Sequence, residues 1–238
     1  MDIKVILPVI SNTLTEETKK EVEGYASSDT KVSVTIIDHG PASIESEYDE
    51  ALCQPGFLEK AIQAEKEGYQ GIISDCLADP GVKAAREVLN IPVVGPGEAA
   101  MQLATSLGNH FSIVTVLPNV VSMLENLSKV SGFYNKLTSI RDINIPVLEL
   151  NDKNRLKQGL FEEMKRTIEE DGAQVLIAGC TGFVGVAEEL QNKLKDSGYD
   201  VPVIDPIFAA TQMLKTMITM NIKQSKLTYM TPPDKERI

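Results

Sequence analysis

The sequence predicts an α/β fold of two similar, pseudo-symmetric lobes with parallel sheets, and it predicts an active site in the cleft between them. Three observations lead to this fold class. Apolar runs rich in β-branched residues alternate with helical stretches, which is typical of parallel sheets buried on both faces. The second half of the chain repeats features of the first. No Gly/Ser-rich or Pro-rich linker separates the halves, so we expect short crossings to join them.

The expected strands are short apolar segments with helices between them. They lie at Ile3–Ile10, Val32–Asp38, Gly71–Ser74, Val93–Val94, Phe111–Leu117, Val147–Leu150, Val175–Ala178 and Val203–Ile204. The clearest expected helices lie at Thr15–Tyr25, Phe57–Glu67, Val82–Leu89, Lys153–Asp171, Phe183–Leu194 and Phe208–Met220. This alternation favours parallel strands joined by helical crossovers.

The internal repeat is clearest around two cysteines, Cys76 and Cys180. Each lies eight residues after a glycine and six after a glutamine, and each follows an expected buried strand. Pro92 and Pro202 begin a second matching pair of segments, and Pro8 and Pro118 each follow an apolar strand. Because the order of these features is preserved, we expect two half-proteins of similar topology.

The composition is that of a globular protein, with 42% hydrophobic and 24% charged residues among 238. Acidic side chains outnumber basic ones by 34 to 23, which gives a formal net charge of -11. A nucleic-acid or anionic membrane partner would require clustered Lys and Arg, and the sequence has no such cluster. The apolar run Val5–Ile10 is too short for a signal peptide or a membrane span, so we expect a cytoplasmic protein with a small-molecule substrate.

The chain has three widely spaced cysteines, which predict neither a disulfide framework nor a metal site. We interpret Cys53, which has no counterpart in the repeat, as structural. Cys76 and Cys180 each follow a strand at its carboxyl end, where open α/β sheets bind ligands. Two such ends facing one cleft would bring two thiols to one ligand.

Such a thiol pair suits the exchange of a proton at a stereogenic carbon next to a carbonyl group. One thiolate removes the proton from one face, and the other thiol delivers a proton to the opposite face. We expect both thiols to lie at helix N-termini, where unpaired backbone N–H groups and the helix dipole lower the thiol pKa. The small residues around Cys180, with Thr181 and Gly182, let backbone amides approach a carbonyl oxygen.

Several motifs are similar to those of the aspartate/glutamate/hydantoin racemase superfamily, and within it to the hydantoin and allantoin racemases. The motifs are Gly40–Ser46, Tyr48–Leu52, Cys76–Gly81, Pro92–Gly95, Glu98–Ala100 and Gly179–Gly182. The resemblance covers nearly the whole chain. It implies a cofactor-independent racemase on two flavodoxin-like lobes, with Cys76 and Cys180 as the acid/base pair. It also implies that the C-terminal helix packs on the first lobe, so we expect residues 1–98 with 207–238 to form the Cys76 lobe and residues 99–206 the Cys180 lobe.

The chain departs from the family pattern at places that concern the substrate. Hydantoin racemases typically carry Asn-Pro-Asn after the first strand, where this chain has Leu7, Pro8 and Val9. We expect Asn12, with Ser11, to replace the missing polar contacts. Asp75 stands immediately before Cys76, where a carboxylate on the same side of the chain would raise the thiol pKa, although adjacent strand residues point to opposite faces.

The candidate substrate-binding residues are Ser43, Asn12, Thr115, Leu77, Thr181 and Gly182. Ser43 lies in the Gly-Pro motif, and its alternative role is to cap the helix that follows. We assign no catalytic role to His39, which follows the second strand. Met213, Met217 and Met220 recur at helical spacing and indicate either core or a subunit contact, so we expect a homo-oligomer.

We interpret the chain as a racemase or epimerase that needs no metal or organic cofactor and acts on a hydantoin-type or amino-acid-derived substrate. No Arg or Lys lies inside the cysteine motifs, which favours a neutral ring over a dicarboxylate. Three alternatives stay open. They are a decarboxylase or cis-trans isomerase on the same scaffold, a two-lobed small-molecule binding protein, and a redox switch between Cys76 and Cys180.

Overall fold

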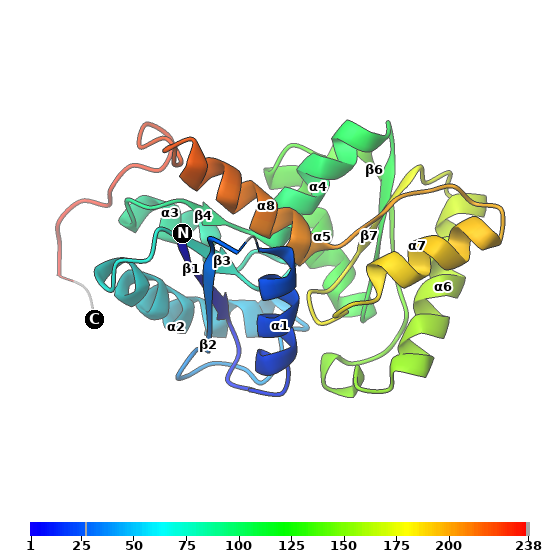
Figure 1. Ribbon diagram of the computed structural model, residues 1–238, viewed down its shortest axis with the longest axis horizontal. Coiled ribbons are helices and arrows are strands. Elements are labelled where there is room, and N and C mark those ends of the chain that lie inside the picture. Colours follow the sequence, from blue (N-terminus) through cyan, green and yellow to red (C-terminus); the bar gives the residue numbers. More distant parts are fainter. Residues whose placement is uncertain (27, 237–238) are drawn as a thin grey trace.

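The computed structural model describes residues 1–26 and 28–236, which form two halves with the same order of elements (Figure 1). The first half contains β1 (Asp2–Leu7), α1 (Thr15–Tyr25), β2 (Lys31–Ile36), α2 (Glu47–Lys66), β3 (Gly71–Ser74), α3 (Val82–Val88), β4 (Val93–Val94) and α4 (Pro96–Leu107). The second contains β5 (Phe111–Thr115), α5 (Pro118–Val130), β6 (Leu137–Asp142), α6 (Lys153–Glu169), β7 (Val175–Ala178), α7 (Ala187–Asp196), β8 (Val203–Ile204) and α8 (Pro206–Thr219). Two 3-10 helices, η1 (Tyr134–Lys136) and η2 (Val147–Glu149), flank β6.

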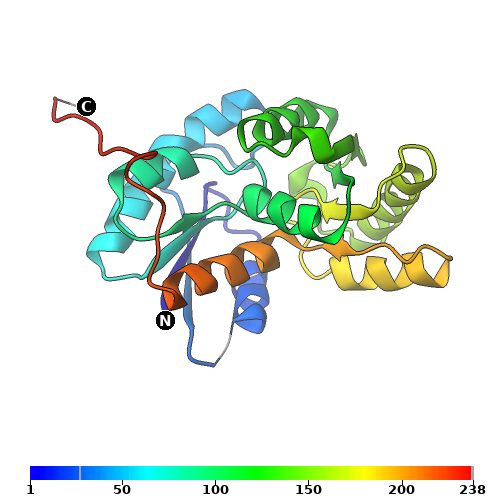
Figure 2. The same cartoon turned by 90° about the horizontal axis from the view of Figure 1, so that it is seen from above.

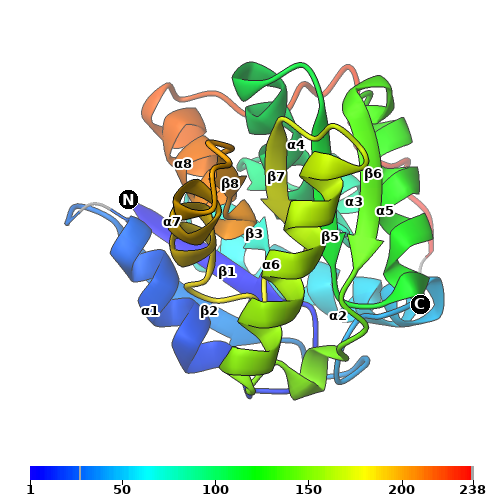
Figure 3. The same cartoon turned by 90° about the vertical axis from the view of Figure 1, so that its right-hand side faces the viewer.

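Each half forms its own four-stranded parallel sheet. The strand orders are β2-β1-β3-β4 and β6-β5-β7-β8, so equivalent strands occupy equivalent places. Every residue of the central strands β3 and β7 is buried, because helices cover both faces of each sheet. Helices α6 and α7 lie on the side of the second sheet that faces the viewer in Figure 3. The predicted α/β fold with two similar parallel sheets is confirmed.

The last helix of each half packs on the sheet of the other half. Helix α4 contacts β5 and β7, and α8 contacts β3 and β4, where Leu214 and Ile218 cover Gly71. Figures 1 and 2 show α8, in orange, lying across the first half. The two halves are therefore joined by a reciprocal exchange of helices. The division into residues 1–98 with 207–238 and residues 99–206 remains a prediction that agrees with these contacts.

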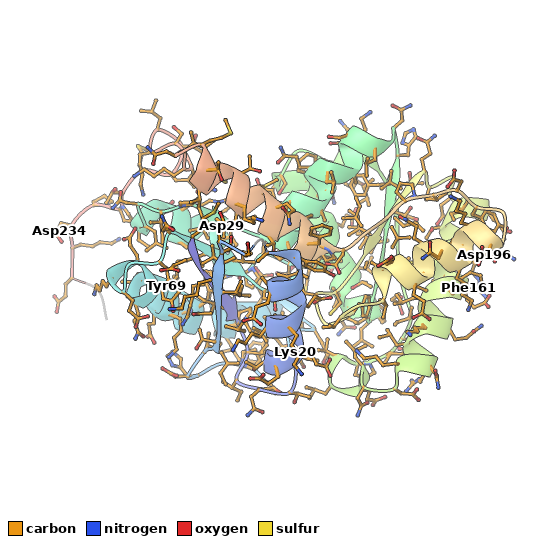
Figure 4. All side chains as sticks on the ribbon, viewed as in Figure 1. Lys20, Asp29, Tyr69, Phe161, Asp196 and Asp234 are labelled. Carbon is orange, nitrogen blue, oxygen red and sulfur yellow. The ribbon has the colours of Figure 1, made fainter. Side chains whose placement is uncertain are left out.

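The hydrophobic core is continuous through both halves. Its main cluster contains Ile73 of the first sheet and Ile177 of the second, together with Leu214 of α8. A second cluster fills the other face of the first sheet and contains Phe57 and the fully buried Cys53. Figure 4 draws the side chains on the ribbon. The labelled Tyr69 belongs to the first half, and the labelled Phe161 and Asp196 lie at the end of the second half that is farthest from the first.

One predicted strand is wrong. The segment Val147–Leu150 is not a strand but contains η2, and the missing strand is β6, ten residues earlier in the chain. Strand β6 lies at the edge of its sheet and is mostly half-buried, and only Leu137 and Ile140 of its six residues are apolar. An edge strand therefore lacks the continuous apolar run that indicates a central parallel strand.

Some helix boundaries also differ from the predictions. Helix α2 begins at Glu47 instead of Phe57, because Ser46 caps it by accepting the Asp49 N–H at 3.2 Å, and Pro55 lies inside the helix. Helix α7 begins at Ala187 instead of Phe183. Helices α4 and α5 were not among the clearest predicted helices, and both begin with a proline at the first position.

Candidate active site

A cavity of about 130 Å³ is lined by residues from both halves, at the carboxyl ends of the central strands. Cys76 and Cys180 both line it. Each cysteine lies two residues beyond the end of its strand, Cys76 after β3 and Cys180 after β7. The two strands hold equivalent places in their sheets, so the repeat brings the two thiols to one cavity from opposite halves.

Cys76 lies on a turn that is tied to the second half. The Asp79 N–H donates to the carbonyl oxygen of Cys76 at 3.0 Å, and Asp79 adopts a left-handed backbone conformation with φ of 55°. The Asp79 carboxylate accepts the N–H groups of Gly97 at 2.7 Å and of Glu98 at 2.8 Å. These two residues open α4, so the Cys76 turn is anchored to a helix that packs on the second sheet.

Cys180 lies on a turn flanked by glycines. The Gly182 N–H points at the Cys180 Sγ over 3.3 Å. A Cβ at Gly179 would lie 2.3 Å from the carbonyl oxygen of Val114, so a larger residue would push the turn away from β5. The Thr115 hydroxyl donates to the carbonyl oxygen of Gly179 at 2.8 Å and holds the turn from behind.

Burial raises the pKa of both cysteine thiols, which contradicts the expectation of lowered values. The pKa of Cys180 is raised to about 12, and that of Cys76 lies well above its usual value, chiefly because burial disfavours the thiolate. The expectation was wrong because neither thiol lies at a helix N-terminus. Helices α3 and α7 begin only at Val82 and Ala187, beyond the reach of the helix dipole.

Four of the candidate substrate-binding residues line the cavity, namely Ser43, Leu77, Thr181 and Gly182. Ser43 does not cap α2, since Ser46 does, and its hydroxyl donates to Glu45 at 3.3 Å. Asn12 is exposed to solvent, and Thr115 is buried behind Gly179. Neither Asn12 nor Thr115 contributes to the cavity wall.

Most of the remaining wall is apolar, and the sequence motifs did not indicate much of it. The apolar residues include Leu7, Val9, Val116, Val120, Met123 and Leu150. Leu7 and Val9 occupy the place where the family typically has asparagines. The internal repeat could have pointed to Val116. Pro118 follows β5 as Pro8 follows β1, so the residues just before these two prolines occupy equivalent places in the two halves.

The charged side chains at the cavity wall are Glu17, Asp75 and Lys153. Lys153 is the one basic side chain among the described wall residues, and its Nζ lies 3.8 Å from a carboxylate oxygen of Glu17 on the other half. Glu45 accepts the Val147 N–H at 2.6 Å and so joins the Gly-Pro motif to η2. The wall therefore offers no free cation to a substrate carboxylate.

A buried acid, Asp75, and a half-buried acid, Glu21, lie next to the Cys180 turn. Asp75 is 7% exposed, and burial with the nearby charge of Asp205 raises its pKa to about 7. Its Oδ1 has no hydrogen-bond partner among the described residues. Burial also raises the pKa of Glu21 to about 7, and its carboxylate accepts the Gly185 N–H at 2.8 Å. Glu21 thus ties α1 of the first half to the loop that follows Cys180.

Within residues 1–26 and 28–236, no three His, Cys, Asp or Glu side chains are grouped closely enough to hold a metal ion. The same residues contain no helix with the length and apolar character needed to cross a bilayer.

Comparisons with known proteins give a consistent result. The family model described as Asp/Glu/Hydantoin racemase matches residues 3–214. A hydantoin racemase of Pseudomonas sp. (strain NS671) is 38% identical, over 100% of this chain and 94% of its own length. A hydantoin racemase of Paenarthrobacter aurescens is 34% identical over 99% of each chain. The solved structure of an allantoin racemase from Klebsiella pneumoniae superposes with a TM-score of 0.92 and 33% identity, over 99% of this chain and 95% of its own.

Proposed function

Because the chain belongs to the Asp/Glu/hydantoin racemase family, we propose that it racemises a hydantoin-type substrate without a cofactor, with Cys76 and Cys180 as the two acid/base groups. The observation that carries this proposal is the pair of thiols, which line one cavity from equivalent positions of two repeated halves. A planar intermediate between them could receive a proton on either face.

In the proposed reaction, the thiolate of one cysteine removes the proton from the carbon next to the ring carbonyl. The electron pair of the broken C–H bond moves onto the carbonyl oxygen, and the backbone amides near Thr181 and Gly182 stabilise that charge. The thiol of the other cysteine then protonates the same carbon on its opposite face. The two cysteines thereby exchange protonation states, and the next turnover in the reverse direction restores them.

The raised thiol pKa values make the two thiolates strong bases, which suits the removal of a proton from carbon. A thiolate that is costly to form in the buried cavity is a strong base toward a weakly acidic carbon, since basicity rises with pKa. The proportion of thiolate at neutral pH is correspondingly small and increases with pH. Because the two thiols share one cavity, the pH profile would report macroscopic pKa values of the pair.

The wall supports a neutral substrate over an acidic amino acid. Its apolar residues suit a ring or an apolar substituent, and Lys153 is engaged by Glu17. Ser43 and Thr181 offer hydroxyl groups for the polar atoms of such a ring. Asn12 and Thr115 lie outside the cavity wall. We assign Thr115 the role of supporting the Cys180 turn. The contact between Asn12 and the substrate stays a prediction that mutagenesis of Asn12 can test.

The test uses solvent deuterium exchange and polarimetry with both enantiomers of a substituted hydantoin. Replacing either active-site cysteine by serine should lower racemisation by about 100-fold or more, the usual contribution of a general acid or base. Each variant should still exchange the proton of one enantiomer only, and the two variants should prefer opposite enantiomers. Cys53→Ser is the matched control, because Cys53 is buried and does not line the cavity.

Unchanged racemisation in both Cys76→Ser and Cys180→Ser, or wild-type protein that incorporates no deuterium into any hydantoin, would refute the proposal. A homo-oligomer and a cytoplasmic location belong to the same proposal. Light scattering of the purified protein tests the first, and cell fractionation tests the second.

A further inference from the structure

A second cavity lies against the first and is larger. Its volume is about 350 Å³, and it is bounded by α2 and α3 of the first half and α5 of the second. Two residues line both cavities, Ala78 and Met123. Ala78 lies two residues after Cys76, so the partition between the cavities stands directly beside one of the two thiols.

Met123 is the larger of the two residues that line both cavities. It belongs to α5 of the second half, is 3% exposed, and packs into the core cluster of the first half with Cys53 and Phe57. Ala78 contributes only a methyl group. A methionine side chain has three rotatable bonds and adapts to different neighbours more easily than a branched side chain does. The separation of the two cavities thus rests on one flexible side chain.

The volume of the first cavity limits what it can hold. A volume of about 130 Å³ resembles that of an apolar cavity of roughly 150 Å³ that accommodates a benzene molecule. One small ring therefore fills most of the space between the thiols. A long substituent on that ring needs further room, and the larger cavity lies behind Met123.

Acidic side chains outnumber basic ones at the wall of the second cavity, where Glu47, Glu50, Asp79 and Glu98 stand against Lys83 and Arg86. Glu47 and Glu50 line it, and burial together with the nearby charge of Glu47 raises the pKa of Glu50. Arg86, which also lines the cavity, is engaged by Glu98 at 2.7 Å. The carboxylates at this wall favour a group that carries a positive charge or several hydrogen-bond donors.

We propose that Met123 is a specificity-determining residue, which closes the substrate cavity against an acidic subsite for long substituents that end in an ammonium or another donor group. This inference rests on the proposed function and names the substrates that the same site would select. In the wild-type protein the Met123 side chain limits the length of the substituent, and its removal joins the two cavities.

The experiment compares hydantoins that carry a methyl, a butyl or an aminobutyl substituent. Met123→Ala should raise kcat/KM for the butyl compound relative to the methyl compound by about tenfold or more, since filling an apolar pocket with a few methylenes gives effects of this size. The aminobutyl compound should gain a further factor of about two to five, as expected for a partly exposed ion pair. Adding Glu50→Gln to Met123→Ala should remove that further factor and leave the gain of the butyl compound.

The matched control is Met164→Ala, because Met164 is equally buried in the second half and lines neither cavity. Ratios between substrates within one variant are insensitive to the fraction of folded protein. The same series is measured as equilibrium binding by calorimetry, which tests the partition without turnover.

Wild-type protein without turnover on any hydantoin would refute the proposed function alone. If Met123→Ala changes kcat/KM and binding affinity by the same factor for all three substrates, the inference about Met123 is overturned. An equal gain for the butyl and aminobutyl compounds would overturn the acidic character of the subsite.

Discussion

The carboxyl group of Asp75 is buried next to Cys76 and Cys180, and its ionisation should weaken the folded state. Its pKa is raised from 3.8 to about 7, with burial as the main cause, and the side chain is 7% exposed. A shift of about 3 units at about 1.4 kcal/mol per unit corresponds to about 4 kcal/mol between the two protonation states. Asp75→Asn removes the ionisation and keeps the shape of the side chain.

The direction of the effect follows from proton binding. Below about pH 4 the carboxyl is protonated in both the folded and the unfolded protein and contributes no difference. Between about pH 4 and pH 7 only the unfolded protein loses the proton, so the free energy of unfolding falls as pH rises. Above about pH 7 both states are ionised, and the loss stays constant at about 4 kcal/mol.

Asp75→Asn should therefore be more stable than the wild type by about 2 kcal/mol at about pH 5.5 and by about 4 kcal/mol at about pH 8. For a chain of this size, the larger difference corresponds to a rise in Tm of about 8 to 16 °C. Differential scanning calorimetry over this pH range measures the change. The sequence has no tryptophan, so far-ultraviolet circular dichroism is the suitable second probe.

The control is Asp171→Asn, for which the sign is opposite. The Arg141 guanidinium holds the pKa of Asp171 below its ordinary value, so this carboxylate stabilises the folded protein above that range. Asp171→Asn should lose the same stability at about pH 8 and at about pH 5, and it should lose less only as pH falls below about 4. A stability difference between Asp75→Asn and the wild type that does not grow with pH would refute the reasoning about Asp75.

Three further substitutions test other parts of the structure. Arg86→Ala should cost about 1 to 3 kcal/mol in denaturant unfolding, because it removes a buried charged partner from the half-buried Glu98 carboxylate, and an unchanged midpoint would contradict this. Gly97→Ala should lower both Tm and racemisation, at a cost of about 1 to 3 kcal/mol, since its Cβ would lie 2.1 Å from the Leu77 carbonyl oxygen in the Cys76 turn. Gly24→Ala should raise stability by about 0.5 to 1 kcal/mol without any change in activity, because Gly24 lies in α1 with no atom within 4 Å of the added Cβ, and a lower Tm would count against it.

The central parallel strands could be predicted from the sequence because they are buried on both faces. Strand β3 was located at Gly71–Ser74 and β7 at Val175–Ala178, both with the bounds that the structure has. Such strands consist of continuous apolar runs, which few other elements of this length show. The edge strand β6 was missed because its half-exposed positions carry polar residues, and Val147–Leu150 was mistaken for it because an apolar turn can resemble a short strand.

Only part of the candidate site could be predicted from the sequence. The repeat located Cys76 and Cys180, since each follows a central strand at the same distance from a glycine. The pKa of the two thiols could not be predicted, because it depends on burial by residues distant in sequence. The sequence also could not show whether Asn12 lines the cavity, since a polar residue near a site can point into it or into solvent.

By itself the sequence determined the family, the central strands of both halves and the two cysteines, because local periodicity and repetition are properties of the chain alone. Only the tertiary structure decided that α4 packs on the sheet of the second half, that Met123 lines two cavities, and that Asp75 is buried next to Cys180. These features arise where surfaces from the two halves meet. Their energies depend on how completely water is excluded there, and no pattern of neighbouring residues contains that information.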